Sequence, residues 1–190
     1  MKCNSKPKKK TLNTKNGTDV YKMGQINQKW DKILELIFEY PNQKFTIREI
    51  SKKTKIPSSS VQRYIQELKN EGVLIKEGRA NTNDYFKLKK TFFIIDKMHE
   101  SGLIDYLVKE LNPSVIIVFG SIRKGEYERD SDIDLFIESS VEKEIDLKKY
   151  EKLLNHKIQI FIENDINNLH SNLFNSIING IKLFGSFKIK

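Results

Sequence analysis

The stretch FGSIRKGEYERDSDIDLFI, residues 119–137, holds a Gly-Ser turn, a basic cluster and two aspartates that are two residues apart. The run that leads into it, SVIIVFG, is rich in β-branched residues and ends in glycine, which predicts a strand buried on both faces. The run SDIDLFI predicts a second strand. Because residues two apart in a strand share a face, Asp132 and Asp134 project together. The apolar residues of this strand then pack into the core: Ile133, Leu135 and Ile137.

These ingredients suit a nucleotide phosphate with its magnesium. Gly120 lets a phosphate approach the backbone closely, and Ser121 starts a helix whose first amides point outwards. Two neighbouring carboxylates repel each other unless a cation lies between them, and Mg²⁺ prefers oxygen ligands and bridges phosphates. The residues therefore predict a site in which Asp132 and Asp134 hold Mg²⁺ or Mn²⁺ beside a bound phosphate.

Other phosphate and metal motifs do not fit this chain. A Walker A loop would need Lys-Ser or Lys-Thr after Gly125, where Glu126 and Tyr127 stand. An EF-hand that starts at Asp130 would lack both its glycine and its final glutamate. The single cysteine and the three histidines show no spacing of zinc ligands.

Charge divides the chain into two unequal halves. Residues 1–90 carry 21 Lys and Arg against 9 Asp and Glu, which gives +12, whereas residues 91–190 carry 13 against 16, which gives −3. A basic first half indicates that this half meets a polyanion. No apolar run approaches the roughly 18 residues of a membrane span, and one cysteine in a polar tail forms no internal disulfide, so we expect a cytoplasmic protein.

The basic half predicts a tail followed by three helices. Residues 1–24 are polar and basic, and we expect a disordered tail there. A helix with one apolar face starts near Gln28 and ends before Pro41. Thr46 is expected to cap a second helix, with Glu49 completing a capping box, and Ser58 to cap a third. The third helix has a predicted buried stripe: Val61, Tyr64, Ile65 and Leu68.

Two strand-like runs follow the third helix, at residues 73–76 and 85–88, and predict a β-hairpin. Three helices and a hairpin in this order resemble the winged helix-turn-helix family, over residues 25–90. That resemblance implies that the third helix reads DNA in the major groove and that the hairpin grips the DNA backbone. The predicted DNA-contacting side chains on the third helix are Ser59, Ser60, Gln62, Arg63 and Gln66, and those on the hairpin are Lys76, Arg79 and Lys87. The alternative is a protein-docking module with a solvated polar face.

Gly-Ser, ten intervening residues and Asp-x-Asp resemble the signature of polymerase-beta-like nucleotidyltransferases, and GSIRKG with SDIDL is similar to the minimal branch of that superfamily. The resemblance covers residues 112–190 and implies a small mixed sheet flanked by helices. It also implies that Gly120 and Ser121 hold the terminal phosphates of a nucleoside triphosphate. Lys124 is the third residue expected to bind the phosphates; it stands where the branch often has arginine, so it keeps the positive charge but cannot make a bidentate contact.

The family usually supplies a third carboxylate from a later strand, and here that strand reads HKIQIFIEND. Gln159 occupies the expected place, and it brings no negative charge and cannot deprotonate a hydroxyl. Glu163 lies on the same side of the strand but roughly 13 Å further along it, so it can replace the missing group only if the strand bends.

The sequence thus predicts an α+β protein: a winged helix-turn-helix (25–90), a helical linker (91–111) that is broken near Ser101 and Gly102, and a minimal nucleotidyltransferase-like domain (112–190). Three functions are left open. One is transfer of a nucleoside monophosphate from a nucleoside triphosphate to an unknown hydroxyl. The second is a DNA-binding regulator whose second domain is degenerate and serves as nucleotide sensor or dimerisation module. The third, which the resemblance implies, is an antitoxin-like role beside a small helical protein. A second copy of the chain is a further expected partner.

Overall fold

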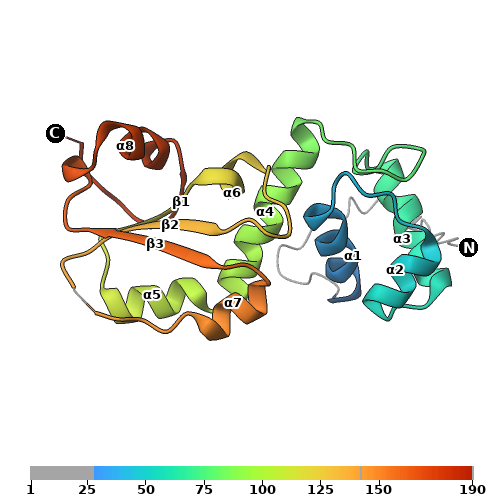
Figure 1. Ribbon diagram of the computed structural model, residues 1–190, viewed down its shortest axis with the longest axis horizontal. Coiled ribbons are helices and arrows are strands. Elements are labelled where there is room, and N and C mark those ends of the chain that lie inside the picture. Colours follow the sequence, from blue (N-terminus) through green and yellow to red (C-terminus); the bar gives the residue numbers. More distant parts are fainter. Residues whose placement is uncertain (1–27, 142, 190) are drawn as a thin grey trace, which may run out of the picture.

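The computed structural model describes residues 28–141 and 143–189 (Figure 1). The predicted disordered tail, residues 1–24, lies outside the described residues. Three helices form the N-terminal unit: α1 (Gln28–Glu39), α2 (Ile47–Thr54) and α3 (Ser58–Asn70). Apolar residues at helical spacing bury one side of each helix, among them Ile33, Ile50 and Val61, which are at most 2% exposed. The predicted three-helix order is confirmed.

The starts of α2 and α3 differ in their capping. At α2 the predicted capping box is present, because the Glu49 amide donates to Thr46 Oγ1 at 3.2 Å while the Thr46 amide donates to Glu49 Oε2 at 2.7 Å. At α3 the predicted cap is wrong. Pro57 is the N-cap residue, Ser58 is already helical, and no side chain caps the helix. A proline there fits, because its fixed φ suits a helix start.

The wing is smaller than the predicted hairpin. Among the described residues, Leu74 and Ala80 form the one isolated β-bridge, and the second predicted strand, residues 85–88, is instead the first turn of α4 (Asp84–Glu100). Asn83 caps this helix by accepting a hydrogen bond from the Phe86 amide at 2.9 Å. Tyr85 and Phe86 are aromatic residues of a kind common in strands, so this four-residue run reads as a strand when taken alone.

Helix α4 contacts both halves of the chain, and it spans residues 90 and 91, where the sequence places a domain boundary. On one side, the ring of Phe38 in α1 packs edge-on against Phe86 and Phe93, each at 5.3 Å between centroids. On the other, Thr91 Oγ1 donates to the carbonyl of Ile122 at 2.9 Å. The predicted break after α4 is confirmed, because Gly102 has a φ of +76° and α5 (Leu103–Leu111) follows it.

The C-terminal unit is built on a four-stranded sheet in the order β3-β2-β1-β4. Strand β1 pairs antiparallel with β2 and β4, and β2 pairs parallel with β3, so the sheet is mixed as predicted. The strands and the remaining helices are β1 (Val115–Val118), α6 (Gly120–Lys124), β2 (Ile133–Glu138), α7 (Lys148–Leu154), β3 (Ile158–Glu163), a 3-10 turn η1 (Ile166–Asn168), α8 (Ser171–Ile178) and β4 (Ile181–Gly185).

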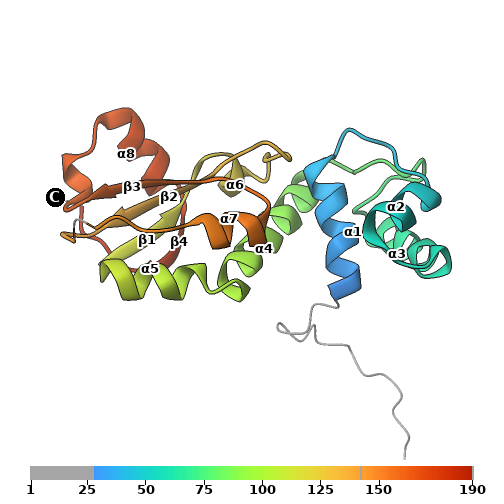
Figure 2. The ribbon, with the colours of Figure 1, turned by 60° about the horizontal axis from the view of Figure 1, so that its bottom comes forward.

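Helices cover both faces of the sheet, with α5 and α7 on one face and α8 on the other (Figures 1 and 2). The α5 and α7 face is lined by Ile116, Val118, Ile133, Leu135 and Ile137. The α8 face is lined by Val115, Ile117, Phe119 and Phe136. Burial on both sides explains the nearly continuous apolar sequence of β1. No helix in the described part of the chain is long and apolar enough to cross a membrane.

Candidate functional site

The site begins where β1 turns into α6. Gly120 has a φ of +67°, in the left-handed region, and a Cβ added there would overlap Oδ2 of Asp134. Two separate constraints therefore require glycine at this position: the backbone conformation and the close approach of the chain to a carboxylate. The turn and the carboxylate lie together because the Phe119 amide donates to the Asp134 carbonyl at 3.1 Å.

The two aspartates lie at the start of β2. Ile133, Leu135 and Ile137 are fully buried, as expected from the alternation, and Asp134 therefore points to the opposite face. Asp134 is half-buried and Asp132 is exposed. Neither carboxylate has a hydrogen-bond or ion-pair partner among the described residues. The pair is thus accessible, and no side-chain cation of the described residues compensates its charge.

The electrostatics of the pair fit a divalent cation. Burial raises the pKa of Asp134, and the negative charge of Asp132 raises it further. A cation between the two groups would remove the second cause and offset the first. Carboxylate oxygens are also the ligands that Mg²⁺ and Mn²⁺ prefer. No group of three or more histidine, cysteine or acidic side chains in the described ranges could hold a metal ion, so within these ranges the site offers Asp132 and Asp134 as its acidic donors.

The register of β3 explains why a third carboxylate is missing. In the parallel pairing of β2 and β3, Asp134 lies beside Gln159, and Glu138 lies beside Glu163, without a bulge between them. Gln159 is therefore the residue next to the aspartate pair. Glu163 lies at the opposite end of the two strands, and the continuous register rules out the bend that would bring it to the site.

The structure separates Ser121 from Lys124. Ser121 is half-buried next to Gly120, and its carbonyl accepts a hydrogen bond from the Glu126 amide at 3.0 Å. Lys124 lies at the other end of α6, where it lines an open hollow with Lys87 and Arg123 on the side of α4. Helix α6 has five residues, so its dipole is small. The glycine at position 120, which leaves the backbone open to a phosphate, is therefore a stronger feature of the site than the dipole of α6. A contact between Lys124 and a phosphate stays a prediction.

The predicted DNA-binding face is available on α3. Four of its side chains are exposed and Ser60 is half-buried; the exposed ones are Ser59, Gln62, Arg63 and Gln66. Arg63 makes one long ion pair with Glu67, at 3.8 Å, and lies over the ring of Tyr64. Such an exposed pair is weak, so the guanidinium can be redirected to a base or a phosphate. Arg79 and Lys76 are exposed on the wing, whereas Lys87 lies on α4 and binds Glu126 at 2.7 Å.

A buried histidine next to the aspartates was not predicted from the sequence. His156 is 5% exposed, and its Nδ1 lies 2.8 Å from the carbonyl oxygen of Ser131, the residue before Asp132. Because a carbonyl only accepts hydrogen bonds, Nδ1–H donates here. Burial lowers the pKa of His156, so it is neutral near pH 7. Residues 131 and 156 are far apart in sequence, and no local pattern connects them.

Comparison with known families agrees with this geometry. Residues 101–189 match the family model described as a nucleotidyltransferase domain. Residues 32–75 match the model described as a winged helix-turn-helix that binds DNA. Neither the curated proteins nor the solved structures contain a significant match.

Proposed function

Because this chain joins a winged helix-turn-helix domain to a nucleotidyltransferase domain, we propose that it is a DNA-binding regulator that binds a nucleoside triphosphate with a divalent cation. The observation that carries the proposal is the pairing of Asp134 with Gln159. The site keeps the glycine turn and the two carboxylates that suit a metal-bound phosphate, and it has an uncharged amide where a third carboxylate would stand.

Each residue of the site has a separate part in this proposal. The backbone at Gly120 and Ser121 accommodates the terminal phosphates, and Asp132 and Asp134 hold Mg²⁺ or Mn²⁺. The bound cation would neutralise the charge of the phosphates. Gln159 can offer its carbonyl oxygen as a neutral ligand. The exposed side chains of α3 would read the DNA, with Arg79 of the wing on its backbone.

Nucleotidyl transfer is the second candidate, and the intact pair of Asp132 and Asp134 beside Gly120 favours it. In that reaction an acceptor hydroxyl attacks the α-phosphorus in line, the bond to pyrophosphate breaks, and pyrophosphate leaves. The attacking hydroxyl must also lose its proton to a base. Gln159 cannot take that proton, which is why binding is better supported than turnover.

Calorimetric titration of each nucleoside triphosphate with Mg²⁺ tests the proposal. We expect binding to the native chain that requires the metal and that the double variant Asp132→Asn/Asp134→Asn abolishes. Absence of binding to the native chain would refute the nucleotide-binding function and leave DNA binding alone. Release of pyrophosphate by the native chain would favour the transferase instead.

The variant Gln159→Asp separates binding from turnover. It restores a third carboxylate next to Asp134, so we expect a rise in metal affinity and, with a suitable acceptor, the appearance of pyrophosphate release. Gln159→Leu is the matched control, since it removes the amide without adding charge. Binding to a second copy of this chain, or to a small helical protein, stays a prediction.

A further inference from the structure

The loop between α6 and β2 ties the nucleotide site to the winged helix. We call residues 126–131 the docking loop, because they contact α1 and lead directly into Asp132. Arg129 anchors this loop to the end of α1 twice: its guanidinium lies 3.0 Å from Glu39 Oε1, and its amide donates to the Glu39 carbonyl at 3.2 Å. Asn42, just after α1, donates to Glu128 at 3.3 Å.

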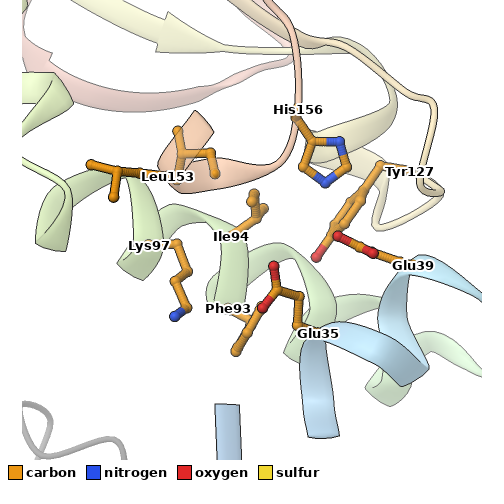
Figure 3. Close-up of a pocket in the computed structure, with 9 residues that line it drawn as sticks. Glu35, Glu39, Phe93, Ile94, Lys97, Tyr127, Leu153 and His156 are labelled. Atoms are coloured by element: carbon orange, nitrogen blue, oxygen red, sulfur yellow. The ribbon is translucent and has the colours of Figure 1, made fainter. Parts of the chain in front are cut away.

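Tyr127 fixes the docking loop from its other side. Its side chain is 1% exposed, and its hydroxyl donates to the carbonyl of Lys90 in α4 at 3.1 Å. Its ring meets the ring of His156 edge-on, with 5.5 Å between centroids. In Figure 3, Tyr127 lies between His156 and Glu39, at the place where α1, α4 and the turn before β3 meet.

The strand that carries Gln159 is tied to the same helix. Asn155 Nδ2, in the turn before β3, donates to Glu35 Oε1 at 2.7 Å. Glu35 and Glu39 are one helical turn apart on α1, so one face of this helix contacts the beginnings of both strands. His156 joins the two beginnings to each other through the Ser131 carbonyl. The residues that carry the nucleotide site, Asp132 and Gln159, follow these anchors by only three or four positions.

The carboxylate of the central ion pair is buried, whereas the side chain of Arg129 is 38% exposed. Glu39 is 7% exposed, and burial raises its pKa although Arg129 acts in the opposite direction. A buried carboxylate that loses its partner is strongly destabilising. Any movement of α1 must therefore carry Arg129 and the docking loop with it, or leave Glu39 unpaired in the interior.

Resting on the function proposed above, we propose that α1 positions Asp132 and Asp134 through the Glu39–Arg129 pair, so that DNA binding and metal–nucleotide binding are thermodynamically coupled. The coupling is reciprocal by necessity: if DNA changes the affinity for nucleotide, nucleotide changes the affinity for DNA by the same factor. Couplings of this kind are typically about 5- to 150-fold.

The test compares the dissociation constant of Mg²⁺–ATP, from calorimetry, with and without a saturating mixed-sequence DNA duplex. In the native chain we expect DNA to change this constant by about fivefold or more. Glu39→Gln should abolish the change, because the neutral amide loses the ion pair. Glu71→Gln is the matched control: Glu71 pairs with Lys89 at 2.6 Å between α3 and α4 and does not touch the docking loop, so this variant should keep the native factor. An unchanged nucleotide affinity in the native chain, or a native factor in Glu39→Gln, overturns the proposal.

Hydrogen exchange keeps this inference separate from the nucleotide-binding function. If the native chain does not bind Mg²⁺–ATP, the proposed function fails, and the amides of residues 129–134 still report on positioning. Glu39→Gln should speed their exchange, and Glu71→Gln should leave it unchanged. Equal exchange in both variants overturns the positioning role. Should Glu39→Gln fail to fold, Asn155→Gly takes its place, because it removes one exposed hydrogen bond to Glu35 and glycine adopts the left-handed φ of 57° at this position without strain.

Discussion

Gly120 shows how strongly a single residue constrains this site. An alanine there would combine a left-handed backbone with overlap of its Cβ and Oδ2 of Asp134. We expect Gly120→Ala to lower the free energy of unfolding by about 1–3 kcal/mol and to weaken Mg²⁺–nucleotide binding by more than about tenfold. Calorimetry and denaturant unfolding measure the two effects.

Gly102→Ala is the control for this prediction, since Gly102 has a φ of +76° and nothing lies within 4 Å of an added Cβ. Gly102→Ala should lower the free energy of unfolding through backbone strain, and it should leave Mg²⁺–nucleotide binding unchanged. If both variants bind nucleotide equally well, the contact between Gly120 and Asp134 does not shape the site.

Lys90 makes stability depend on pH. It is 1% exposed, and burial lowers its pKa from 10.5 to about 8. Below pH 8 both the folded and the unfolded chain carry its charge, and the folded state bears the cost of burial. As the pH rises from about 8 towards 10.5, only the unfolded state keeps the proton, so stability increases, by at most about 3 kcal/mol. The ring of Tyr127, 4.4 Å from Nζ, offsets part of the cost.

Lys90→Met checks this effect by denaturant unfolding between about pH 7 and pH 10. The variant should be more stable than the native chain near neutral pH, and it should lack the native rise with alkalinity. A variant that keeps the full rise would assign it to another group.

At the scale of residues, the sequence predicts what is local. The spacing of Asp132 and Asp134 is set by one strand, and the resemblance to the nucleotidyltransferase family implied the place of Gln159, which the register agrees with. The anchors Glu39 and Arg129 lie 90 positions apart, and an ion pair over that distance leaves no periodic signal. The same holds for His156, whose contact with Ser131 joins positions 25 residues apart.

Among the elements, α2 and α3 give a direct test of capping. Thr46→Ala removes the side-chain bond to the Glu49 amide and should cost about 1 kcal/mol of stability. Ser58→Ala should cost at most about 0.5 kcal/mol, because Pro57 is the N-cap residue of α3 and Ser58 makes no capping bond. Thermal unfolding compares the two, and equal losses would contradict the assignment.

Helix α3 carries the prediction on DNA. Arg63→Ala should weaken binding by about 1–3 kcal/mol and relax sequence preference if Arg63 reads a base edge, whereas a uniform loss with a smaller salt slope would make it a phosphate contact. Lys109→Ala, an exposed cation on α5, should leave binding unchanged. Fluorescence anisotropy with duplex DNA at several salt concentrations distinguishes these results, and an unaffected Arg63→Ala would refute the role of α3.

Elements with a long periodic pattern, a capping box or a continuous apolar run were predictable, whereas the second strand of the wing and the cap of α3 were predicted wrongly. The prediction of the second wing strand was wrong because residues 85–88 resemble a strand when taken alone. The helical spacing of Phe86, Phe93 and Ile94 becomes visible over the full 17 residues of α4. The predicted N-cap residue of α3 was wrong for a related reason. Serine and proline are both suited to a helix start, and local sequence does not decide which residue takes the cap.

For the whole molecule, the shared helix α4 predicts a strict length requirement. Inserting one alanine between Lys90 and Thr91 turns the rest of α4 by about 100° and shifts it by about 1.5 Å. The packing of Phe86 against Phe38 and the hydrogen bond from Thr91 to the Ile122 carbonyl can then no longer form at the same time. We therefore expect a large loss of thermal stability. An insertion between Gln43 and Lys44, in an exposed turn, should be tolerated. Equal tolerance at both places would show that the two halves are held independently.

The same requirement should limit insertions and deletions within α4 among related chains. Loops can gain or lose residues freely, but α4 can change length only in steps that restore its helical phase. Two whole turns, about seven residues, come close to doing so, yet they move the halves apart by about 10 Å, beyond the reach of Glu39 and Arg129. Among related chains that keep this ion pair, gaps in the alignment should therefore be absent from residues 84–100, even where the side chains of α4 have diverged.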